Sequence, residues 1–92
     1  MLCIDVTSAG PVHADRVIQV RVQEDICQFQ LCAIAYFGGG HYVTRLISSQ
    51  HHVWFHDGIT SGALTVYEGS VNDCDLTVCN TRTPVVYLYA PL

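Results

Sequence analysis

The stretch Gly38-Gly39-Gly40-His41-Tyr42, read with the later stretch Trp54-Phe55-His56-Asp57-Gly58, decides how this chain is interpreted. Consecutive glycines supply the positive φ angles of a tight hairpin turn, so the first stretch predicts a turn between two strands. The turn delivers His41 to the start of the second strand, and Asp57 closes the strand after that. A histidine oriented by a carboxylate forms two of the three parts of a nucleophilic catalytic site.

His41 and Asp57 are expected to lie side by side. If the hairpin between their strands is centred on Ser49, antiparallel pairing places His41 opposite Asp57, and directly opposed Cβ atoms lie about 4.5–5.5 Å apart. The aspartate then accepts a hydrogen bond from one imidazole nitrogen and leaves the other as a general base. A two-residue turn would shift the pairing to Gly58. A cross-strand His–Asp pair without a catalytic role is the competing interpretation.

Strand patterns dominate the rest of the chain. Residues 18–22 alternate between apolar and polar, while residues 28–37 are apolar on both faces in the middle, which is typical of a covered central strand. Strands are expected at residues 2–6, 16–22, 28–37, 41–48, 51–56 and 85–90, with 59–69 open between strand and irregular structure and one helical turn at 75–79 capped by Asp73 or Asp75. The predicted fold is mainly β: an antiparallel sheet of five or six strands with at most one short helix.

Composition limits the size and the partners of this chain. It has 92 residues, of which 13% are charged, with four arginines and no lysine; ordinary soluble domains have roughly 25% charged residues. Residues 1–92 are therefore predicted to be a single incomplete domain, covered by the rest of a larger protein; a compact β domain with an uncharged polar surface is the alternative.

Several classes of partner are disfavoured. The net charge is −4 and there is no basic run, which predicts no nucleic-acid binding. The apolar runs are too short for a spanning helix, so no membrane segment is predicted. The amino end does not resemble a signal peptide, which predicts an intracellular location in the cytoplasm or nucleus.

The remaining polar residues give weaker signals. The five cysteines are expected to be free thiols, because their spacing is C-x4-C rather than the C-x2-C of zinc sites: Cys3, Cys27, Cys32, Cys74 and Cys79. His51, His52 and His56 are interpreted as surface residues rather than metal ligands, and no metal or cofactor is predicted. Arg45 shares the face of His41 and is interpreted as a surface charge rather than a partner of Asp57.

Leu31, Tyr36 to Tyr42, Trp54 to Gly58 and Val85 to Tyr89 together resemble the carboxy-terminal part of the ubiquitin-specific protease family. These enzymes are papain-like cysteine peptidases that remove ubiquitin. The resemblance covers about residues 16–90 and implies that the sheet is part of an α+β papain-like fold, the carboxy-terminal portion of a catalytic domain.

The resemblance assigns roles to individual residues. His41 matches the general base of the family, and Asp57 matches the third triad member that orients it. Gly39, Gly40 and Tyr42 match the turn near the glycine tail of the substrate and are expected to bind it. Trp54 and Phe55 match the aromatic residues that pack behind the site.

Two parts of the family's site are missing from these 92 residues. The nucleophile in a Gly-Asn-Thr-Cys type box and the oxyanion-stabilising side chain before it have no counterpart here, and none of the five cysteines has that context. The resemblance thus implies a fragment of a cysteine-type deubiquitinase that supplies base and orienter and is inactive alone. Its partners would be ubiquitin or ubiquitin-conjugated proteins and the upstream part of the catalytic domain, in the same or another chain. A non-catalytic ubiquitin- or protein-binding module of the same fold is the alternative.

Overall fold

The computed structural model describes residues 2–6, 15–57 and 65–92 and places their strands in one antiparallel sheet. The strands are β1 (Leu2–Asp5), β2 (Val17–Val22), β3 (Asp25–Gly38), β4 (His41–Ile47), β5 (His52–His56), β6 (Val66–Ser70) and β7 (Thr83–Pro91). The mainly β, antiparallel prediction is confirmed. The described residues form seven strands, and the additional one, β6, lies in the region that the sequence left open; residues 58–64 of that region lie outside the described residues.

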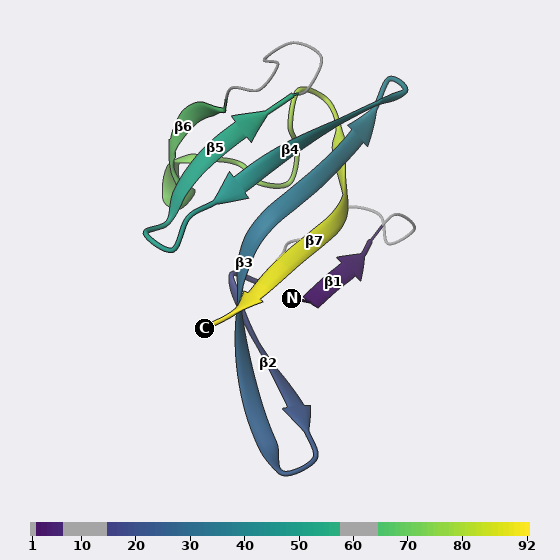
Figure 1. The fold of residues 1–92 in the computed structure, drawn as a ribbon. Helices are drawn as coiled ribbons and strands as arrows, with labels where there is room; N and C mark the ends of the chain where they lie inside the picture. Colours follow the sequence, from purple (N-terminus) through teal and green to yellow (C-terminus); the bar gives the residue numbers. More distant parts are fainter. Residues whose placement is uncertain (1, 7–14, 58–64) are drawn as a thin grey trace.

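The sheet is organised around β3. Its strand order is β1-β7-β3-β4-β5-β6, and β2 pairs with the first half of β3. The second half of β3 lies between β7 and β4, where neighbouring residues Ala33 and Ile34 are both buried as expected of a central strand. The β2–β3 hairpin extends away from the rest of the sheet (Figure 1). We call residues 17–30 the arm; Val22 and Ile26 in it are 55% and 57% exposed.

The core lies on one face of the sheet, which we call the inner face. Side chains alternate between the two faces of a strand, and every second residue of β4 from Val43 to Ile47 is buried. Tyr36, on the neighbouring strand, is fully buried, and its hydroxyl donates to the carbonyl of Leu76 at 2.7 Å. The connection between β6 and β7 therefore covers the inner face, with Val71 and Cys79 contributing to the core.

The short helical turn lies earlier than predicted. It is a 3-10 helix, η1, at Val71–Asp73, capped by Ser70, whose hydroxyl accepts from the backbone N–H of Asn72. In the predicted stretch, residues 75–79, the Asp75 carboxylate instead accepts from the backbone N–H of Thr77 at 2.9 Å. This local bond makes an Asx turn, which competes with a helical turn for the same backbone groups.

The predicted register of the β4–β5 hairpin is wrong by two residues. Arg45 lies opposite Phe55, not opposite Val53. The reason is the turn: the N–H of Ser48 bonds the carbonyl of His52, and His51 adopts a left-handed φ of 65°. A three-residue loop with its last residue in that conformation recentres the hairpin on Gln50. Because an even shift preserves the faces of a strand, His41 and Asp57 stay on the inner side.

Candidate functional site

The glycine turn builds the first half of the site. Gly38 pairs with His41 across β3 and β4, so the loop between them has two residues. Gly39 and Gly40 have φ angles of 61° and 73°. Two positive φ angles are typical of a type I′ turn, which matches the twist of the flanking strands. The expected turn is therefore present, and it places His41 at the first position of β4.

His41 and Asp57 are in hydrogen-bond contact. His41 Nε2 lies 2.8 Å from Asp57 Oδ1. If the β4–β5 register is extended by one residue beyond Thr44 and His56, Asp57 lies opposite Val43. The contact between His41 and Asp57 is therefore diagonal across the two strands, over a separation that two extended side chains can bridge. The side chains are 22% and 7% exposed, respectively. The structure thus brings the two predicted residues together, by a route that differs from the predicted one.

The contact with Asp57 engages one ring nitrogen of His41 and leaves the other open. An ionised carboxylate only accepts hydrogen bonds, so it holds the ring proton at Nε2. The lone pair of a neutral imidazole is then at Nδ1, and within the described part of the chain Nδ1 has no hydrogen-bond partner. Asp57 makes further interactions in the chain besides the one with His41. A half-buried histidine with a fixed tautomer and an open nitrogen is able to act as a general base.

Arg45 is not the surface charge that the sequence suggested. It is 9% exposed. Its guanidinium donates to Glu68 Oε1 at 2.8 Å and to the carbonyls of Asp75 and Val78 at 2.6 and 2.9 Å. It also lies over the ring of Tyr36, 5.5 Å from its centroid. Burial acts to lower the pKa of Arg45, but its hydrogen bonds to Glu68 and Tyr36 outweigh that effect and raise it.

The Arg45 network stabilises the inner face beside the candidate pair. Burial raises the pKa of Tyr36 to about 12, although its hydrogen bond to Arg45 acts in the opposite direction. The alternation of β4 already placed Arg45 on an apolar face, and a charge at such a position requires a buried partner. That signal was available in the sequence. The partner, Glu68, was not, because it lies in the region where the strand pattern is weakest.

The five thiols do not supply a nucleophile to this pair. Cys3 and Cys27 are exposed on other strands. Cys32 donates to the carbonyl of Leu88, and Cys74 contacts the carbonyl of Glu68. Burial raises the pKa of the Cys79 thiol and that of Cys74, which is the opposite of the lowered pKa that activates a cysteine.

Of the other described residues of the two deciding stretches, Tyr42 and Trp54 lie on the outer face of the sheet, whereas Phe55 lies on the inner face opposite Arg45. Tyr42 is 62% exposed and packs on Phe37 with ring centroids 4.5 Å apart. Phe55 packs against the core as expected, whereas Trp54 lies on the outer face against Tyr67. Strand alternation explains the separation, because residues adjacent in a strand point to opposite faces.

The three clustered histidines are separate in the structure. His51 is in the turn, the ring of His52 is hydrogen-bonded to the Tyr67 hydroxyl at 2.8 Å, and His56 pairs with Thr44. Among the described residues, no group of three or more histidine, cysteine, aspartate or glutamate side chains is arranged to hold a metal ion.

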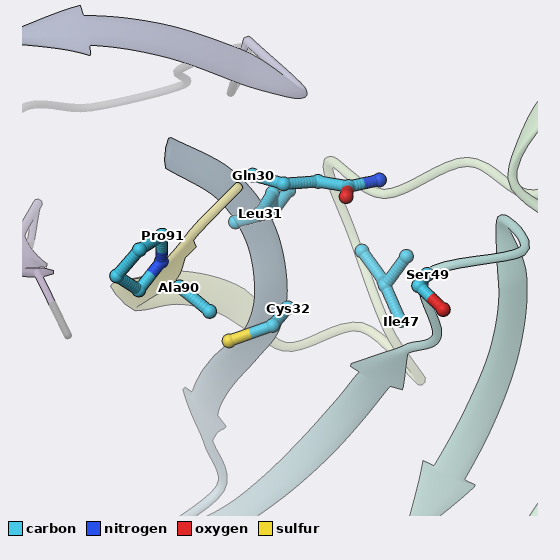
Figure 2. Close-up of a pocket in the computed structure, with 7 residues that line it drawn as sticks. All are labelled: Gln30, Leu31, Cys32, Ile47, Ser49, Ala90 and Pro91. Carbon is cyan, nitrogen blue, oxygen red and sulfur yellow. The ribbon is translucent and has the colours of Figure 1, made fainter. Parts of the chain in front are cut away.

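A hollow of about 170 Å³ lies beside Ile47 (Figure 2), at the opposite end of β4 from His41. Its lining comes from β3, from the end of β4 and the turn after it, and from β7: Gln30, Leu31, Cys32, Ile47, Ser49, Ala90 and Pro91. It is mostly apolar and is separate from the candidate pair, so it does not form a substrate pocket for His41.

Comparison of the chain with protein-family models, with curated proteins and with solved structures gave no match. In the part of the chain that the structure describes, none of the helical structure could cross a membrane.

Proposed function

We propose that this chain is the base-and-orienter part of a cysteine-type deubiquitinase. The observation that carries the proposal is the 2.8 Å contact between His41 Nε2 and Asp57 Oδ1, with Nδ1 left open. The resemblance to the ubiquitin-specific proteases supplies the substrate class, ubiquitin conjugates. The papain-like fold of the complete catalytic domain belongs to this proposal as well.

In the proposed reaction, His41 Nδ1 accepts the proton of a cysteine thiol, and the thiolate attacks the carbonyl carbon at the end of ubiquitin. Asp57 stabilises the imidazolium that forms, and the same nitrogen then gives its proton to the leaving amine. The thiol and the oxyanion-stabilising group come from outside these 92 residues. The two glycines of the turn carry no side chains, and a Cβ built on either meets no atom within 4 Å among the described residues beyond its chain neighbours, which leaves space for an extended peptide beside His41.

The first test is binding at the turn. In a titration of the ¹⁵N-labelled chain with ubiquitin, the amide signals of Gly39, Gly40 and His41 are expected to shift. Ubiquitin without its two terminal glycines serves as the matched control and is expected to leave these signals in place. Unchanged signals at the glycine turn up to millimolar ubiquitin would contradict the proposal.

The second test is turnover. The chain alone is expected to hydrolyse a ubiquitin–fluorophore conjugate no faster than buffer, because the base has no thiol to deprotonate. Removing the nucleophile of such a unit leaves at most residual catalysis. A rate above buffer that disappears in His41→Ala would show that one of the five thiols acts as the nucleophile after all.

A non-catalytic binding module is the second candidate, and the exposed Phe37–Tyr42 pair favours it. These rings pack against each other at a tilt of 45° on the outer face, next to the glycine turn, and exposed aromatic rings are common anchors of protein interfaces. Tyr42→Ser and His41→Ala separate the two functions. If ubiquitin binding is lost in Tyr42→Ser and retained in His41→Ala, the binding module is the better description.

A further inference from the structure

Arg82 lies against the turn that carries His41. Its Nε–H donates to the carbonyl oxygen of Gly38 at 3.1 Å and to that of His41 at 3.3 Å. These two residues pair with each other and flank the two-residue loop, so a single N–H group joins both ends of the turn. A Cβ on Gly38 would lie 2.9 Å from Arg82 Cγ. Glycine at this position therefore leaves the space that the arginine side chain occupies.

The backbone of Arg82 is itself held tightly. Two hydrogen bonds of 2.9 and 2.8 Å join the backbones of Cys79 and Arg82, and Cys79 is buried in the core. The two residues between them, Asn80 and Thr81, have φ angles of 49° and 66°. A positive φ is unusual for a β-branched residue such as threonine. Strained residues of this kind persist where the surrounding structure demands them, often beside functional sites.

We infer that Arg82 is a positioning residue for the His41–Asp57 pair. Within the described part of the chain its side chain donates to backbone carbonyls and not to Asp57 or the ring of His41. It therefore acts through the two carbonyl groups that fix where β4 begins. A tight turn anchored in the core thus sets the place from which the His41 ring reaches Asp57. The inference rests on the proposed function only for the role of His41 as a base; the positional claim is independent of ubiquitin.

The test compares Arg82→Met with Arg21→Met by NMR of the histidine ring. Methionine keeps an aliphatic side chain against Gly38 and loses the donor, while Arg21 is exposed in the arm and serves as the matched control. In Arg82→Met we expect a dispersed amide spectrum, loss of the Nε2-bound proton signal of His41, and about five- to tenfold faster hydrogen exchange of the His41 amide, as for the loss of one hydrogen bond. Arg82→Lys, which retains a cationic donor, is expected to restore part of the ring signal.

Gly38→Ala perturbs the same contact from the other side, because the added methyl group displaces the arginine side chain. It is expected to reproduce the loss of the His41 ring signal while Arg82 is present. An unchanged ring signal in either folded variant would overturn the inference. Unfolding of both variants would also overturn it, because the contact would then support the whole fold rather than the placement of His41.

The NMR measurements on these variants require neither ubiquitin nor catalytic turnover. If the ring signal is lost in Arg82→Met and the wild-type chain does not bind ubiquitin, the proposed function fails and the positioning role stands. If ubiquitin shifts the turn signals and the ring signal survives in Arg82→Met, the positioning role fails and the proposed function stands.

Discussion

His41 and Arg45 lie on the same face of β4, four residues apart, and their surroundings are opposite in kind. Arg45 is buried and donates hydrogen bonds to a carboxylate, two backbone carbonyls and a hydroxyl group. His41 is partly exposed, its ring has one hydrogen-bond partner among the described residues, and one ring nitrogen is open.

The difference separates a structural role from a chemical one. A polar group whose hydrogen-bonding capacity is satisfied inside the protein contributes to stability and specificity of the fold. A titratable group that is fixed on one side and open on the other has capacity left for a substrate. On this comparison the Arg45 end of β4 holds the sheet to the β6–β7 connection, and the His41 end is the reactive one.

The largest expected effect is therefore at Arg45. Arg45→Ala removes the guanidinium group that donates hydrogen bonds to the carbonyls of Asp75 and Val78 and to the carboxylate of Glu68. We expect a loss of about 3 kcal/mol in the free energy of unfolding, measured by urea denaturation followed by circular dichroism.

Two variants sharpen this result. Arg21→Ala, in the exposed arm, is the matched control and is expected to change stability by less than about 0.5 kcal/mol. Arg45→Lys keeps the charge but cannot form the planar set of bonds, so we expect it to recover only part of the loss. An Arg45→Ala variant as stable as Arg21→Ala would show that the network contributes nothing and would remove the contrast with His41.

The sequence was sufficient for the parts of this contrast that depend on local chemistry. Consecutive glycines before a strand required a tight turn, and two of them, Gly39 and Gly40, have the positive φ that the turn needs. Alternation along β4 placed His41 and Arg45 on one face. Even the wrong register preserved the His41–Asp57 contact, because the error of two residues kept both side chains on the same side.

The parts that the sequence did not reveal depend on distant segments. The third glycine, Gly38, does not have the positive φ that the turn suggested but lies against Arg82, and nothing local identified that arginine, which is 44 residues away. Glu68 follows the undescribed residues 58–64 and lies in a short strand without a strong pattern. The register was missed because His51 adopts a left-handed φ that histidine adopts uncommonly, and no sequence rule places it there.

An intermediate effect is expected from alkaline pH at Tyr36, which belongs to the Arg45 side of the comparison. Burial raises the pKa of Tyr36 from 10.0 to about 12. The unfolded tyrosine therefore ionises near pH 10 while the folded one keeps its proton, so the folded state binds more protons in this window and stability falls as the pH rises. We expect a loss of roughly 2 kcal/mol between pH 10 and 12 from this group, since one pKa unit corresponds to about 1.4 kcal/mol.

Tyr36→Phe isolates this contribution. The variant loses the hydrogen bond to Leu76, so its stability at pH 8 is expected to be lower, but its decline between pH 10 and 12 is expected to be less steep. Absence of lysine from the chain simplifies the measurement, because no ammonium group titrates in this range. Parallel pH profiles for the two proteins would contradict the assignment to Tyr36.

The smallest effect on stability is expected at His41, and it decides whether His41 differs from Arg45 in role. His41→Ala removes one hydrogen bond from a partly exposed ring, and Asp57 retains its other interactions in the chain. We expect a loss of about 1 kcal/mol or less, measured by the same urea denaturation as for Arg45→Ala. Residues kept for chemistry commonly contribute little to stability, and their replacement is sometimes stabilising. A loss equal to that of Arg45→Ala would instead make His41 a structural residue, and the contact with Asp57 would then be explained by the fold alone.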